Sequence, residues 1–133
     1  MHDMTNALAA DAARHVENLE VIRDPLTRAA YVWLLLESER AGLRSSCNSG
    51  KVHAVRLHDH ADRYLFSWSA NIGHLLFYLR RPALDDLPGL AVSAKETFAS
   101  ASDNPCGEIT IRLHDVREAA ELAAWLFTKL RQD

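Results

Sequence analysis

The sequence predicts an α+β protein in which a single-layer antiparallel or mixed sheet of about four strands packs against helices. Two observations favour this class. Apolar residues recur at spacings of three and four near both ends of the chain, as in amphipathic helices. Short runs of alternating apolar and polar residues occupy the middle, as in half-buried strands. The 133 residues contain no linker or repeat that would divide them, so we expect residues 1–133 to form a single domain.

Two helices are expected before the sheet. The stretch Thr5–Ile22 places its apolar residues on one helical stripe. Asp24 then suits the N-cap of a second helix, because its carboxylate can accept backbone N–H bonds, and Pro25 suits the first helical position. This helix should end near Arg40, since Gly42 tolerates the positive φ of a C′ residue. Its wide apolar arc predicts that it is the most buried helix.

Three strands are expected in the middle of the chain, at Val52–His58, Tyr64–Ser69 and His74–Arg80. The second run alternates strictly, so that Tyr64 and Trp68 should share one face of the sheet. A short Asn/Gly turn separates it from the third run. The second and third strands are therefore expected to form a hairpin.

The segments around these strands give weaker patterns. Arg44–Gly50 is rich in Ser, Asn and Gly, which predicts a loop. Ser93 and Glu96 fit a capping box and predict a short helix over Ala94–Ser100.

A last strand and a last helix complete the expected order. Glu108–Leu113 alternates, with Thr110 and Arg112 on the outer face. Asp115 begins a second capping box, and the helix after it should end near residue 131. The expected order of elements is α-α-β-β-β-(α)-β-α.

Charge is distributed in three blocks along the chain. Residues 1–39 and 83–133 each carry a net charge of −4. Residues 40–82 carry seven basic and two acidic side chains, a net charge of +5, and coincide with the three expected strands. A basic sheet between acidic helices indicates a surface that faces an anionic partner.

The basic block supplies the candidate binding residues. The candidate phosphate contacts are Lys51, Arg56, Arg63, Arg80 and Arg81, and the candidate base-stacking groups are Tyr64 and Tyr78. The alternative is that these charges only solvate an outer surface and that the rings belong to the core. The pI of about 6.1 argues against strong non-specific nucleic-acid binding. Our first hypothesis is a non-enzymatic binding module whose anionic partner is DNA or RNA.

Two other kinds of site match parts of the sequence. His58 and His60 would share a strand face and could bind zinc or copper, but the sequence fixes no further ligand, and a solvated turn is the favoured interpretation. Cys47 could act as a nucleophile if Arg44 and Lys51 lowered its pKa, but an inert thiol is favoured. We therefore assign no catalytic residue and no cofactor, and a metal-dependent enzyme is the least supported hypothesis.

The second hypothesis is a protein-interaction module, of an immunity or regulatory type, in which the acidic helices make the contacts; the oligomeric state stays open. No membrane span is expected, because the longest apolar run, Ala29–Leu36, is shorter than the roughly 20 residues that a span needs. Asp3 and Asp11 interrupt any signal-peptide pattern. Together with two cysteines that need no disulfide, this predicts a cytoplasmic protein with reduced thiols.

Several short segments resemble the MmcQ/YjbR-like family. They are Gly50–Val55, Leu76–Pro82, Leu84–Leu87 and the strand–helix unit of Ile109–Leu113 and Glu118–Leu126. The resemblance spans roughly residues 50–130 and implies an antiparallel sheet backed by helices. It also implies DNA binding, which has been proposed for members of that family, but it points to no individual site residue.

Overall fold

The computed structural model describes the backbone of residues 2–131 and the side chains of residues 10–131. Its helices are α1 (His2–Val21), α2 (Pro25–Arg40), α3 (Arg81–Asp86), α4 (Leu90–Thr97) and α5 (Val116–Arg131). Its strands are β1 (Arg44–Cys47), β2 (Ala54–His58), β3 (Tyr64–Ala70), β4 (Leu75–Leu79), β5 (Ser102–Asp103) and β6 (Ile109–Leu113). None of the described helices is long and apolar enough to cross a membrane.

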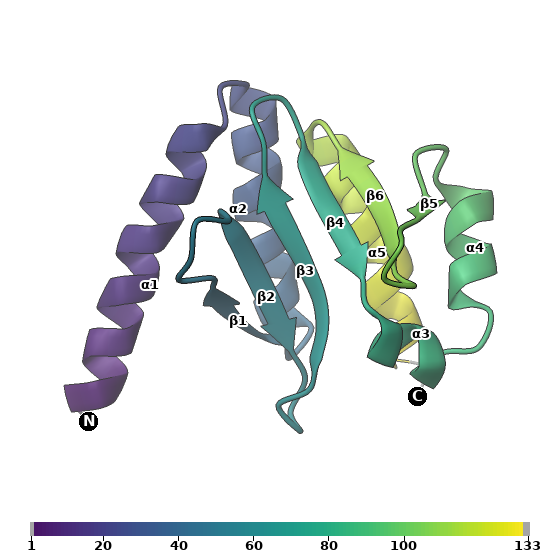
Figure 1. Cartoon of the computed structure of the whole chain (residues 1–133), viewed down its shortest axis with the longest axis horizontal. Coiled ribbons are helices and arrows are strands. Elements are labelled where there is room, and N and C mark those ends of the chain that lie inside the picture. The colour runs from purple at the N-terminus through teal and green to yellow at the C-terminus, as the bar shows by residue number, and fades with distance from the viewer. Residues whose placement is uncertain (1, 132–133) are drawn as a thin grey trace.

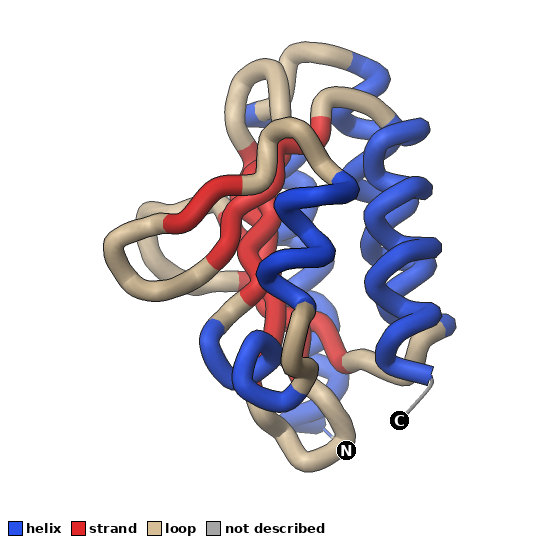
Figure 2. Tube along the Cα trace, turned by 90° about the vertical axis from the view of Figure 1, so that its right-hand side faces the viewer, coloured by secondary structure: helices blue, strands red, loops and turns tan. Residues whose placement is uncertain are grey.

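The strands form one antiparallel sheet in the order β1-β2-β3-β4-β6-β5 (Figure 1). Helices α2 and α5 pack against each other on one side of this sheet (Figure 2). Helix α1 lies along the β1 edge, and α3 and α4 lie toward the opposite edge (Figure 1). We call the other side of the sheet, over which no described helix lies, the open face. The expected class, an α+β fold with an antiparallel sheet against helices, is confirmed.

The core lies between the sheet and the pair α2/α5. Strand residues that point toward the helices are buried, and they include Val55, Leu57, Phe66, Trp68, Leu75, Phe77, Leu79, Ile109, Ile111 and Leu113. At the centre, the Trp68 ring stacks on Phe77 with 6.3 Å between ring centroids and meets the edge of Tyr31 at 5.8 Å. Because successive side chains of a strand point to opposite faces, the strand residues between these buried ones lie on the open face.

The sheet has six strands, so the expected number of about four and the expected order of elements were wrong. Segment 44–47, predicted as a loop, pairs with β2 from Arg44 opposite His58 to Cys47 opposite Val55. A second unexpected strand, Ser102–Asp103, pairs with β6. Both are short and polar and lack the apolar alternation that marks a strand in a sequence. They form because the neighbouring strand offers them unpaired backbone groups, which is a tertiary effect.

Helix boundaries agree with the sequence where local chemistry sets them. Asp24 caps α2 by accepting a hydrogen bond from the Leu26 backbone N–H at 2.8 Å, and Gly42 after the helix has φ of 85°. At α5, the Asp115 carboxylate accepts from the Glu118 N–H at 2.9 Å. The Glu118 carboxylate accepts in turn from the backbone N–H of His114. The second capping box is thus confirmed, with one difference: the Glu118 carboxylate accepts from His114 and not from the N-cap residue Asp115.

The first expected capping box was wrong. Helix α4 begins at Leu90 and ends at Thr97, so Ser93 lies inside it and caps nothing. The Ser93 hydroxyl instead accepts a hydrogen bond from the indole N–H of Trp125 at 3.1 Å. Gly89, with φ of 87°, precedes the helix and allows the sharp turn after Leu87.

Candidate anion-binding face

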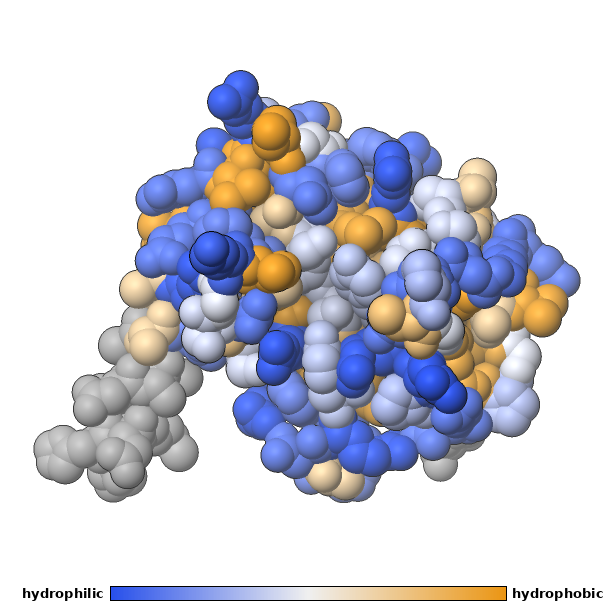
Figure 3. Space-filling model, in the orientation of Figure 1, coloured by the Kyte–Doolittle hydropathy of each residue, from blue (hydrophilic) through white to orange (hydrophobic). Residues whose placement is uncertain are grey.

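One row of paired residues crosses the open face from edge to edge. In strand order its members are Ser46, Arg56, Ser67, Tyr78, Thr110 and Ser102. Directly paired residues project on the same side of a sheet, so the row combines four hydroxyl groups, one guanidinium and one phenol. Figure 3 views this side of the molecule, where hydrophilic and neutral residues dominate the middle of the sheet.

Two arginines meet around one tyrosine beside this row. The guanidinium carbon of Arg80 lies 3.8 Å from the ring centroid of Tyr64, and that of Arg56 lies 5.3 Å from it. The centroid of the His58 ring lies 5.5 Å from the centroid of the Tyr64 ring. We call these four residues the Tyr64 cluster. Cation–π attraction to one ring holds both cations near each other despite their like charge.

The position of Tyr64 corrects a sequence prediction. Leu57 pairs with Phe66, but the next β2 residue, His58, pairs with Tyr64, so β3 has one extra residue at this point. Such a bulge reverses the alternation beyond it. Tyr64 therefore lies on the open face and not beside Trp68, while the extra residue, Leu65, is buried at 4 % exposure.

Both guanidiniums are anchored and still have unused donors. Arg80 donates from Nη1 to the Tyr64 carbonyl at 2.7 Å and from Nε to Glu108 at 3.2 Å. Arg56 donates from Nη2 to the Asn48 side-chain oxygen at 3.1 Å. Within the described residues, the Nη2 group of Arg80 and the Nε and Nη1 groups of Arg56 have no partner. Because Glu108 balances the charge of Arg80, the group of Arg56, Arg80 and Glu108 carries a net charge of +1.

Arg63 does not join this cluster. It pairs with Asp59 at 2.8 Å and with Asp86 at 2.6 Å. Burial opposes ionisation of Asp59, but hydrogen bonds from the backbone and side chain of Arg63 outweigh it and lower the pKa of that carboxyl group. These residues line a hollow of about 320 Å³ on the helical side, together with His60. Arg63 therefore ties a turn to α3 through side chains that are at least partly exposed.

The remaining predicted residues occupy three places. Tyr78 is half-buried at the centre of the open-face row, where none of the described rings or cations stacks on it. Lys51 and Arg81 are exposed and form no ion pair within the described residues. Lys51 lies in the β1–β2 loop, and Arg81 begins α3 with its aliphatic chain against Gly107.

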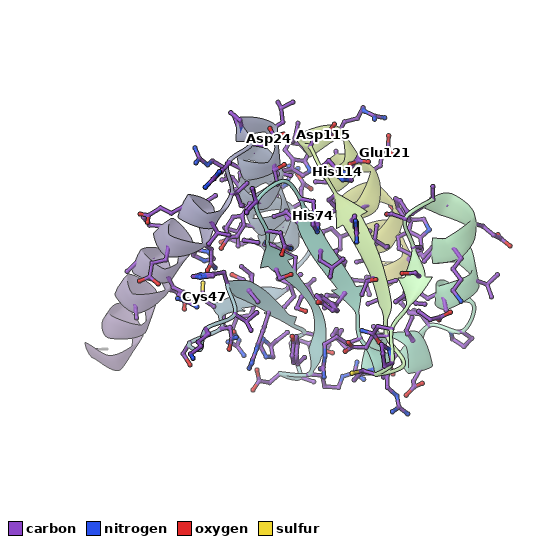
Figure 4. All side chains as sticks on the ribbon, turned by 45° about the horizontal axis from the view of Figure 1, so that its top comes forward. Asp24, Cys47, His74, His114, Asp115 and Glu121 are labelled. Carbon is purple, nitrogen blue, oxygen red and sulfur yellow. The ribbon has the colours of Figure 1, made fainter. Side chains whose placement is uncertain are left out.

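Arg112 belongs to the open face and was missing from our candidates. It pairs with Leu76 in the sheet, is exposed, and forms no ion pair within the described residues. Its charge acts on His74, whose pKa is lowered first by burial and then by Arg112 (Figure 4). Alternation had already placed Arg112 outward. Arg112 lies in an acidic block of the sequence, and the net charge of a block does not reveal which residues are neighbours in space.

The structure separates the two histidines that were weighed as metal ligands. Strand β2 ends at His58, so the alternation that would align it with His60 stops there. His58 lies against Tyr64 on the open face, whereas His60 lines the hollow on the helical side. Among the described side chains, no group of three or more His, Cys, Asp or Glu residues is placed to hold a metal ion.

Cys47 lies at the β1 edge against α1 (Figure 4). Its sulfur is 3.4 Å from Nε2 and 3.5 Å from Nδ1 of His15, and its backbone N–H donates to Asp11. Burial, and secondly the charge of Asp11, raise the pKa of the thiol to about 12. Burial lowers the pKa of His15. The pair is therefore neutral near pH 7, which disfavours a nucleophilic role for Cys47.

Alkylation should distinguish the two thiols. We expect iodoacetamide at about pH 8 to modify exposed Cys106 at least about tenfold faster than half-buried Cys47, because the thiolate is the reacting species. Peptide mass spectrometry over time measures both rates in one sample. The Cys106→Ser variant should lose the fast phase, and equal rates for the two cysteines would contradict the neutral Cys47–His15 pair.

Comparisons with protein-family models, curated proteins and solved structures found no match to this chain. The resemblance to the MmcQ/YjbR-like family therefore stays a prediction.

Proposed function

We propose that the open face of the sheet binds a nucleic acid without catalysing a reaction. The observation that carries this proposal is the Tyr64 cluster, in which Arg56 and Arg80 are held on one ring with donors to spare. A planar guanidinium fork matches the oxygens of a phosphate group, and anchoring it beforehand reduces the entropy lost on binding. Arg112 adds a third cation on the same face.

A nucleic acid fits this face better than an isolated anion does. The Tyr78 ring lies in the row between Ser67 and Thr110 with no described ring or cation stacked on it, so it can receive a base. Tyr64 has a different role from the one we expected, since Arg80 covers its ring and it orients guanidiniums in place of stacking on a base. Bases that must reach a sheet surface have to be unpaired, so the proposed ligand is single-stranded.

Binding should depend strongly on salt. If three phosphates are contacted, the affinity for a single-stranded oligonucleotide should fall about 40-fold between about 50 and 300 mM salt, since each contact releases counterions. Fluorescence anisotropy with labelled DNA and RNA strands of equal sequence measures this. An affinity that does not change with salt would contradict the proposal.

Charge removal locates the interface. The variants Arg56→Gln and Arg112→Gln should each weaken binding about tenfold and reduce the salt slope by about 0.7, the contribution of one phosphate contact on a single strand. Arg117→Gln is the matched control, because Arg117 is an exposed arginine on α5, on the helical side of the sheet. The interface would lie elsewhere if Arg117→Gln weakened binding as much as the open-face variants.

A further inference from the structure

The outer face of α2 is apolar although it is exposed. Leu26 is 58 % exposed, Val32 44 %, Trp33 37 % and Leu36 54 %, and Ala29 lies exposed among them. At 3.6 residues per turn these five residues form one stripe, which we call the α2 stripe. The expectation that α2 is the most buried helix was wrong, because nine of its residues are exposed and α5, of the same length, has only five exposed residues. A continuous apolar stripe of this kind is typical of an interaction surface.

Two opposite charges lie along one edge of the α2 stripe. Arg28 is near the start of the helix and Glu39 near its end, on the same side as Val32. The Nε group of Arg28 donates to the Ile22 carbonyl at 2.6 Å, which leaves its terminal nitrogens without a described partner. Glu39 forms no ion pair within the described residues. The edge is thus positive at one end and negative at the other.

We propose that a second copy of the chain covers the α2 stripe, with the two α2 helices antiparallel about a twofold axis near Val32 and Trp33. In such a pair, residues at equal distances before and after the axis face each other. Ala29 then faces Leu36 of the second copy, so a small side chain meets a large one. Arg28 lies four and a half residues before the axis and Glu39 six and a half after it, on the same edge of the helix. The two side chains are therefore offset by about 3 Å along the helix, which their length can span, so opposite charges meet twice. The stripe is complementary to its own reverse, which is the property that distinguishes a second copy from an unrelated partner.

A hollow beside the stripe supports the same arrangement. It measures about 340 Å³ and lies between Trp33 and Arg40 of α2 and the small residues Ala120 and Ala124 of α5. Reversal about the axis brings Leu26 of the second copy to within one residue of Arg40, at the mouth of this hollow. Leu26, the most exposed of the large apolar residues of α2, is buried in this arrangement.

The test is the mass of the full chain in solution as a function of concentration. Sedimentation equilibrium from about 5 to 200 µM should show a species of twice the 14.9 kDa chain mass. Leu36→Arg should raise the dimer dissociation constant about 100-fold or more, since it removes a central apolar contact. Val92→Arg is the control, because Val92 is 61 % exposed on α4 and should leave the dimer intact. Circular dichroism melts confirm that both variants are folded.

A charge exchange tests the antiparallel register itself. Arg28→Glu alone should weaken the dimer about tenfold, because two attractive pairs become repulsive, and adding Glu39→Arg should restore it. A chain that is monomeric at the highest concentration would overturn the proposal. So would a dimer that is insensitive to Leu36→Arg, or a double variant that stays as weak as Arg28→Glu.

Discussion

Replacing Trp68 by alanine is expected to lower the free energy of unfolding by about 3–5 kcal/mol. Trp68 is fully buried in β3, where its ring stacks on Phe77 and packs edge-to-face with Tyr31. Strand β3 lies between β2 and β4, and α2 closes the core above it. Because the surrounding strands are fixed by hydrogen bonds on both sides, they cannot collapse far into the space left by the indole, and most of the cavity should remain.

Urea unfolding followed by circular dichroism measures this loss. Trp68→Phe should cost much less than Trp68→Ala, since it keeps an aromatic ring and removes an indole N–H that has no hydrogen-bond partner among the described residues. Val92→Ala, at an exposed site, should change stability by no more than about 0.5 kcal/mol. Equal losses for the alanine and phenylalanine variants would show that the ring itself contributes little.

The second large effect is expected at Asn18. This fully buried side chain donates to the Tyr31 hydroxyl at 2.9 Å and accepts from His53 Nδ1 at 3.2 Å. The Tyr31 hydroxyl is also hydrogen-bonded to His15 at 2.7 Å, so the network joins α1, α2 and the β1–β2 loop. Asn18→Ala should cost about 1–3 kcal/mol, because it leaves buried polar groups without a partner.

A double-mutant cycle separates the network from simple packing. If Asn18 acts through Tyr31, then Asn18→Ala should cost less in a Tyr31→Phe background, by about 0.5 kcal/mol or more, because the hydroxyl that it served is already gone. Glu20→Ala, on the exposed side of α1, is the control for helix propensity. Additive losses would mean that the two side chains stabilise the protein independently.

The parts of the fold that local chemistry determines were predictable. The start of α2 depends on Asp24 and Pro25, and its end on Gly42, all within a few residues of the boundary that they set. The β3–β4 hairpin likewise follows from alternation and a short turn. Strand β1 was not predictable, because a polar tetrapeptide becomes a strand only where another strand lies beside it.

The candidate site was predictable only in composition. Arg56, Arg80 and Tyr64 were among the candidates. They come together only because the extra residue, Leu65, places Tyr64 on the open face of the sheet. Arg63 was a candidate for the same reason as Arg56, yet its partner Asp86 comes from a helix later in the chain. Sequence charge counts treat these arginines alike, whereas the fold assigns them to opposite sides of the sheet.

The attachment of α1 to the sheet affects how copies of this protein meet. Arg14 donates to the carbonyls of Asn48, Gly50 and Val52 in the β1–β2 loop, and Asp11 accepts from the backbone N–H of Cys47. Helix α1 thus covers the end of β1 and the loop that follows it. The far edge ends in a strand of two residues. A sheet with one partly covered edge and one very short edge strand presents few unpaired backbone groups to an incoming strand. This protects the protein from edge-to-edge aggregation. In the proposed dimer, self-association uses the helical side, and a twofold pair of α2 helices closes at two copies instead of continuing into a fibre.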